Sequence, residues 1–201
     1  MYIVIEGQDG TGKSTQARIL AEQFQKQGKE VLIMDEPDGD LEQAHELHDM
    51  ILVKGYDLEP MTNVLLFTAA RVELWKKLAE PVLQRGGVVV SARNWWSTLA
   101  YQGYGEGISR SKIVRLTKQL LPESYVEPDF GVILVTSDEV RLARQGGRGK
   151  KQETFEAKAD EFQQRVNHAY PKIAKEFGVP IIDASGTIEE VTAALKEKLR
   201  L

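Results

Sequence analysis

Short apolar runs alternate along this chain with longer segments in which apolar and polar residues mix at helical spacing. The runs are rich in Val and Ile, which is typical of a parallel sheet buried between helices. The pattern predicts an α/β fold whose strands are Tyr2–Glu6, Glu30–Met34, Val88–Ser91, Gly131–Val135 and Val179–Asp183.

Three of the amphipathic segments are clear helix candidates. The first is Thr15–Phe24, directly after the first strand. The second is Thr62–Leu83, where apolar residues recur near helical spacing and Gly86 follows the end. The third is Thr187–Leu199, in which Thr187 and a glutamate three residues later form a predicted capping box.

Composition narrows the class of protein. With 201 residues, of which 42% are hydrophobic, the chain has the size of one domain, residues 1–201. A net charge of −4 argues against a general nucleic-acid surface, and the absence of cysteine excludes disulfides and thiolate metal sites. No apolar stretch has the length of a membrane span and no signal-peptide pattern is present, so we expect a cytoplasmic protein without a membrane partner.

The most informative motif follows the first predicted strand. Residues 7–14 read Gly-Gln-Asp-Gly-Thr-Gly-Lys-Ser, a G-x-x-x-x-G-K-[ST] loop between a strand and a helix. Such a loop points backbone N–H groups at phosphates, its lysine reaches the β- and γ-phosphates, and its serine ligates Mg²⁺. A glycine-rich turn without a ligand is the alternative, which the flanking strand and helix disfavour. The predicted nucleotide-binding residues are Gly7, Gln8, Asp9, Gly10, Thr11, Gly12, Lys13, Ser14 and Thr15.

A second polar segment, residues 144–153, is rich in glycine and carries four positive charges. It is either a solvated surface loop or a mobile lid, at about 141–157, that closes over the phosphates. In a phosphate-binding protein we favour the lid, with Arg144 and Arg148 as catalytic groups.

Further motifs resemble the thymidylate kinases, the P-loop nucleoside monophosphate kinases that make dTDP from dTMP and ATP. The resemblance extends over nearly the full length. It rests on Ile5-Glu6-Gly7, Glu36-Pro37, Leu65-Leu66-Phe67-Thr68-Ala69-Ala70-Arg71, the Tyr-Gln-Gly segment 97–105, Phe162-x-x-Arg165-Val166-x-x-x-Tyr170 and Ile182-Asp183-Ala184-Ser185.

The resemblance implies a three-layer P-loop NTPase fold with a five-stranded parallel sheet, and it implies the cofactors ATP and Mg²⁺. Phe67 resembles the ring that stacks on thymine, and Arg71 resembles the group that bonds a base carbonyl. Asp9 resembles the carboxylate that meets the acceptor 3′-hydroxyl, and Arg93 the arginine that holds the acceptor phosphate. The implied catalytic residues are Lys13, Asp9, Arg93, Arg144 and Arg148, the implied metal ligands Ser14 and Asp9, and the implied substrate-binding residues Glu36, Phe67, Arg71, Arg93, Thr98, Tyr101 and Gln102.

Each of these side chains also has a structural interpretation. Phe67 and Tyr101 are compatible with the core, and Arg71, on the helical face of Phe67, with a surface ion pair. The adjacent Trp95 and Trp96 are interpreted as packing residues.

The chain departs from the family pattern around one pocket. The family usually has Asp-Arg-Tyr after its third strand, where this chain has Ala92-Arg93-Asn94, so a carboxylate that organises Mg²⁺ is missing. It often has Arg before Glu-Pro, where this chain has Asp35. In the lid, Glu153-Thr154-Phe155-Glu156 lacks a further arginine. Asp9, Glu36 and Asp35 are candidate substitutes for the metal carboxylate.

Three functions are therefore compared. The first is a homodimeric thymidylate kinase with small-molecule nucleotide substrates, dimerising through helices around Thr62–Leu83 and Asn94–Tyr101. The second is a kinase of another acceptor, a modified pyrimidine nucleotide or a nucleoside, which the acid at 35 and Ala92 favour. The third is a nucleotide-binding regulator with weak turnover, which Lys13 and Ser14 argue against.

Overall fold

The computed structural model describes residues 1–146 and 160–200, and contains a five-stranded parallel sheet. The strand order is β2-β3-β1-β4-β5. The strands are β1 (Tyr2–Gly7), β2 (Val31–Asp35), β3 (Val88–Ala92), β4 (Phe130–Val135) and β5 (Ile181–Asp183). All five predicted strands are confirmed with small shifts at their ends.

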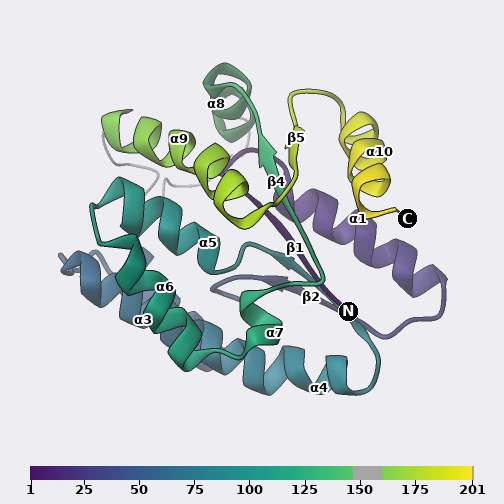
Figure 1. Cartoon of the computed structure of the whole chain (residues 1–201), viewed down its shortest axis with the longest axis horizontal. Coiled ribbons are helices and arrows are strands. Elements are labelled where there is room, and N and C mark those ends of the chain that lie inside the picture. The colour runs from purple at the N-terminus through teal and green to yellow at the C-terminus, as the bar shows by residue number, and fades with distance from the viewer. Residues whose placement is uncertain (147–159, 201) are drawn as a thin grey trace.

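Helices cover both faces of the sheet (Figure 1). On one face, α1 (Lys13–Lys26) and α10 (Ile188–Leu199) pack over an aliphatic cluster that includes Ile5, Val90 and Ala92. A larger, aromatic cluster fills the other face. The helices there are α2 (Glu42–Leu52), α3 (Pro60–Leu74), α4 (Glu80–Gln84), α5 (Trp95–Thr98), α6 (Arg110–Leu120), α7 (Glu123–Val126) and α9 (Asp160–Phe177), and α8 (Asp138–Gly146) follows β4.

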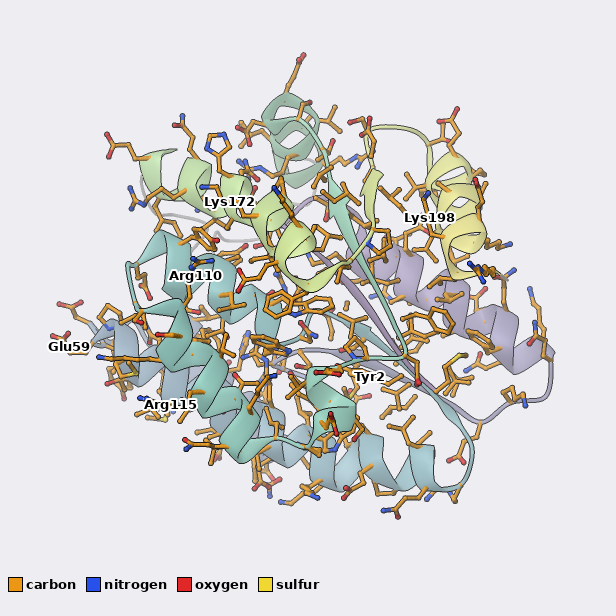
Figure 2. All side chains as sticks on the ribbon, viewed as in Figure 1. Tyr2, Glu59, Arg110, Arg115, Lys172 and Lys198 are labelled. Carbon is orange, nitrogen blue, oxygen red and sulfur yellow. The ribbon has the colours of Figure 1, made fainter. Side chains whose placement is uncertain are left out.

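Figure 2 shows the separation of side chains that produces these layers. Tyr2 lies in the interior, where it is 1% exposed, whereas Arg115 on α6 and Lys198 on α10 lie on the outer surface. The Tyr2 ring packs edge-on against Trp75 and is stacked with Tyr125, with centroids 5.1 and 5.9 Å away. Such aromatic pairs stabilise the fold by more than the burial of their apolar area alone.

The long helix predicted over Thr62–Leu83 is present but interrupted. α3 ends at Leu74, a π-helical turn spans Trp75–Ala79, and α4 continues to Gln84. Pro81 lies in the first turn of α4, and because proline has no N–H it cannot donate to the preceding turn. The helix therefore widens into the π-helical turn just before Pro81.

One segment of the predicted dimer surface is not exposed. Its residues are buried within the chain and so do not form an outer surface for a partner: Asn94, Trp95, Trp96, Ser97, Thr98, Leu99, Ala100 and Tyr101. On α3, Leu65 remains 48% exposed. The homodimer stays a prediction. Trp95 and Trp96 both pack on Phe177, which confirms them as packing residues.

The sheet topology brings three loops together at its carboxyl edge. β1 lies between β3 and β4. After β1 the chain first forms β2 and β3 on one side of it, and then crosses to form β4 and β5 on the other side. In such open sheets ligands bind at this switch point. The loops after β1, β2 and β3 therefore meet beside Gly7, Asp35 and Ala92. In the described part of the chain, no helix has the length and apolar character that a membrane crossing requires.

The predicted capping box of α10 is confirmed. The Thr187 N–H donates to Glu190 Oε2 at 2.8 Å, and the Glu190 N–H donates to Thr187 Oγ1 at 3.2 Å. We expect Thr187→Ala to lower the free energy of unfolding by about 1 kcal/mol, because one helix N–H loses its acceptor. Thr187→Ser keeps the hydroxyl and is the matched control. Urea unfolding of both variants measures the difference, and equal midpoints would contradict the role of the cap.

Candidate functional site

The loop after β1 is shaped by left-handed glycines. Gly10 and Gly12 have φ of 86° and 92°, values that favour glycine. A Cβ on Gly10 would lie 2.9 Å from the Arg141 backbone oxygen, so α8 packs directly on the loop. The Thr11 hydroxyl and Lys13 Nζ both donate to the Gln8 carbonyl, at 2.8 and 2.9 Å. The loop is thus curled at the start of α1, as an anion cradle requires.

Lys13 is buried at the centre of this cradle. Burial is the largest influence and, with the Arg93 charge, lowers the pKa of Lys13 to about 8, while Asp9 acts in the opposite direction. A polyphosphate bound to the loop would raise the pKa of Lys13 again, because an adjacent anion favours the charged lysine.

Asp9 lies between cationic and phenolic groups. Its carboxylate is paired with the Arg93 guanidinium, accepts from the Tyr101 hydroxyl at 2.9 Å, and lies 3.7 Å from Lys13 Nζ. Burial acts to raise the pKa of Asp9, but Arg93 and Lys13 outweigh it and lower that pKa to about 2. The predicted catalytic trio of Lys13, Asp9 and Arg93 is therefore brought together.

Glu6 joins the nucleotide loop to the start of α5, a role that the sequence did not predict. Its buried carboxylate accepts from the Gly7 N–H at 3.1 Å, the Asn94 N–H at 2.8 Å and the Ser97 N–H at 3.0 Å. The only sequence signal is an acidic residue at the end of a buried strand.

Arg71 is held inside a network of buried polar groups. Its Nε donates to Glu36 Oε2 at 3.1 Å, Nη1 to Thr98 Oγ1 at 2.8 Å, and Nη2 to the Asn94 carbonyl at 3.0 Å. The Tyr125 hydroxyl donates to the same Glu36 oxygen at 2.7 Å. Burial outweighs the Arg71 charge and raises the pKa of Glu36 to about 7. Glu36 and Thr98 thus serve to orient Arg71.

Phe67 and Gln102 are two further residues that the sequence predicts to bind the acceptor. The Arg71 guanidinium carbon lies 5.8 Å from the centre of the Phe67 ring, so an aromatic face and a fixed cation are adjacent. Gln102 is 1% exposed, and its Nε2 has no hydrogen-bond partner among the described residues. Buried amide groups of this kind are normally satisfied. Phe67 and Arg71 lie on α3, Thr98 ends α5, and Tyr101 and Gln102 lie on the π-helical turn Leu99–Gly105.

A cavity of about 270 Å³ opens on the other side of the loop. Gly10, Gly12 and Thr15 line it, opposite the segment that follows β5. Arg144 reaches this segment, because Nη1 donates to the Ala184 carbonyl at 2.8 Å and Nη2 to the Gly186 carbonyl at 3.0 Å. Of the predicted lid, Arg141 and Arg144 thus lie on α8, while Arg148 and most of the segment lie outside the described residues.

Comparisons with known proteins agree with this geometry. The sequence profile of the family described as "Thymidylate kinase" matches residues 5–195. The chain belongs to the thymidylate kinase family. A thymidylate kinase of Gluconobacter oxydans is 36% identical over 97% of this chain and 92% of that protein. A probable thymidylate kinase of Thermococcus gammatolerans is 35% identical over 95% and 91%. The crystal structure of the Ehrlichia chaffeensis thymidylate kinase superposes with a TM-score of 0.79 at 28% identity, covering 100% of this chain and 98% of the other.

At the carboxyl edge of the sheet, one further contact joins the nucleotide loop to the end of β2. Ser14 Oγ donates to Asp35 Oδ2 at 2.9 Å, whereas the contacts of Asp9 described above are with Arg93, Tyr101 and Lys13. Hydroxyl and carboxylate oxygens are the hard ligands that Mg²⁺ prefers, so this pair fits a magnesium ion. The metal role expected of Asp9 stays a prediction.

The pKa of Lys13 leads to a test of the cradle. At pH 8 about half of the free protein carries neutral Lys13, and a bound polyphosphate restores the proton. We therefore expect ATP binding at pH 8 to take up about half a proton, and the uptake to fade as the pH falls toward 6. Calorimetry in two buffers of different ionisation enthalpy measures it.

The matched variants are Lys13→Arg and Lys26→Arg. Arginine stays charged, so Lys13→Arg should lose the uptake, while Lys26→Arg, exposed in the last turn of α1, should keep it. Equal proton uptake by wild type and Lys13→Arg would contradict the assignment.

Proposed function

We propose that this protein transfers the γ-phosphoryl group of ATP to dTMP, giving dTDP and ADP, with Mg²⁺ as the metal. The observation that carries this proposal is the contact of the nucleotide loop with the elements that hold the predicted acceptor residues. Asp9 on the loop pairs with Arg93 and accepts from the Tyr101 hydroxyl, and Arg71 donates to the Asn94 carbonyl. The relatives named thymidylate kinase over nearly the full length support the same acceptor.

The donor half follows from the cradle. Backbone N–H groups of the loop and Lys13 would hold the β- and γ-phosphates, and the cavity beside Thr15 would receive the rest of the donor nucleotide. Bound Mg²⁺ supplies charge neutralisation between these phosphates, and Ser14 and Asp35 are the residues that would hold it.

The acceptor half follows from the side chains predicted to bind the acceptor. Phe67 would stack on the base and Arg71 would donate to a base carbonyl, because Glu36 and Thr98 already fix its guanidinium. Gln102 Nε2 offers a further donor. Asp9 would receive the sugar hydroxyl and Arg93 the acceptor phosphate, so that the acceptor oxygen lies in line with the donor.

The assay of function compares acceptors. ADP release is followed with ATP, Mg²⁺ and each nucleoside monophosphate in turn. Turnover with dTMP far above the others is expected. Faster turnover with a different pyrimidine nucleotide would favour a kinase of another acceptor. ATP binding without any turnover would favour a nucleotide-binding regulator.

Phe67 provides the sharper test of the acceptor residues. Phe67→Ala should raise KM for dTMP about 10- to 100-fold, because base stacking on an aromatic ring is lost, while KM for ATP stays the same. Leu65→Ala, on the exposed side of the same helix, is the control. Since Phe67 also lies in the core, circular dichroism checks the fold. An unchanged KM for dTMP in folded Phe67→Ala would remove the ring from the binding site.

A further inference from the structure

The carboxyl ends of β2 and β3 are in direct register. Asp35 is paired with Ala92, and Ala92 with Ile5 on β1. Neighbouring strands lie about 4.8 Å apart, and paired residues of parallel strands point to the same face. Ala92 belongs to the aliphatic cluster under α1. Asp35 therefore projects toward the α1 face, one strand further from the nucleotide loop than Ala92.

From that position Asp35 reaches the loop. Its Oδ2 accepts the Ser14 hydroxyl proton at 2.9 Å. A hydroxyl has one proton and two lone pairs, so giving the proton to Asp35 directs the lone pairs elsewhere, as a metal ligand needs. A carboxylate accepts about four hydrogen bonds, which leaves Asp35 able to bind water molecules of a hydrated cation. Asp35 is also exposed, so such water can reach it.

The other carboxylates at this edge are already engaged. Asp9 is paired with Arg93 and close to Lys13, so cations surround it. Glu36 is buried and bound to Arg71 and Tyr125. Glu6 is buried and accepts backbone N–H groups. Among the residues that the structure describes, Asp35 is the carboxylate that combines exposure with a contact to the loop serine.

We propose that Asp35, on β2, is the positioning residue for the divalent cation of the bound nucleotide, acting through Ser14 and the water shell of the cation. This assignment rests on the proposed function. Asp35 then acts at the donor nucleotide. The small Ala92 side chain leaves room for the Asp35 side chain to reach across β3.

The first test measures the metal directly. Mn²⁺ is titrated into the protein with the non-hydrolysable analogue β,γ-imido-ATP, and bound Mn²⁺ is followed by electron paramagnetic resonance. Asp35→Asn keeps the shape and removes the charge, and should weaken Mn²⁺ about 10- to 100-fold, as loss of a partner of a metal ligand does. Affinity for the same analogue in EDTA should be unchanged or higher, since the phosphates lose a negative neighbour.

The matched control is Asp40→Asn. Asp40 is exposed and follows Asp35 by five residues, so the variant removes one charge nearby without touching Ser14. Its Mn²⁺ affinity should equal that of wild type. Equal Mn²⁺ affinity in wild type and Asp35→Asn would overturn the proposal, as would an equal loss in both variants.

The second test moves the carboxylate between strands. Asp35→Ala should lose Mn²⁺ affinity, and the double variant Asp35→Ala/Ala92→Asp should recover at least about tenfold of it. Ala92→Asp alone should gain little, because Asp35 already holds the role. A double variant no better than Asp35→Ala would overturn the equivalence of the two strand ends.

Turnover of dTMP by the wild type keeps the two proposals apart. Normal turnover together with unchanged Mn²⁺ affinity in Asp35→Asn overturns only the role of Asp35. Absent turnover together with weakened Mn²⁺ binding in that variant overturns only the acceptor and supports the metal role.

Discussion

The buried carboxylate of Glu6 connects the nucleotide loop to the start of α5. It lies at the end of the central strand and accepts N–H groups from Gly7, Asn94 and Ser97. One residue therefore fixes where the nucleotide loop starts and where α5 begins. Phosphoryl transfer depends on positioning, and a shared anchor keeps donor and acceptor elements in a constant relation. Removing it would leave several buried donors without acceptors, each at a cost of about 1–3 kcal/mol.

A second buried network, around Glu36 and Arg71, fixes the side chains predicted to bind the acceptor, and burying its charges costs free energy. Taking Glu36 and Arg71 out of water is unfavourable, and their attraction repays it only with good geometry and further hydrogen bonds. Tyr125, Thr98 and the Asn94 carbonyl supply those bonds. The pair therefore contributes little net stability, and its consequence is that Arg71 has a single orientation beside Phe67. A fixed cation next to a ring selects a flat polar ligand without ordering the side chain at the time of binding.

The sequence predicted the fold well because its strands are short apolar runs bounded by helices. Tyr2–Ile5 and Val88–Val90 are apolar on both faces, which is typical of a buried parallel sheet. The nucleotide loop was equally clear, since its glycines require a special backbone. What the sequence could not supply depends on contacts between distant segments. The Glu6 anchor, the position of Arg144 against Ala184, and the π-helical turn of Leu99–Gly105 follow from packing rather than from local pattern.

The position of Asp35 shows how such a contact changes an interpretation. In the sequence, an acid at 35 stands beside the acceptor motif Glu36-Pro37, and Ala92 is 57 positions away. In the sheet the two positions are paired, and both lie on the side of α1. The proposed metal site requires a carboxylate near Ser14. The ends of β2 and β3 lie about 4.8 Å apart, so a carboxylate at either end can reach Ser14. With the proposed role of Asp35, a loss at one position and a gain at the other leave the metal site of the donor nucleotide intact.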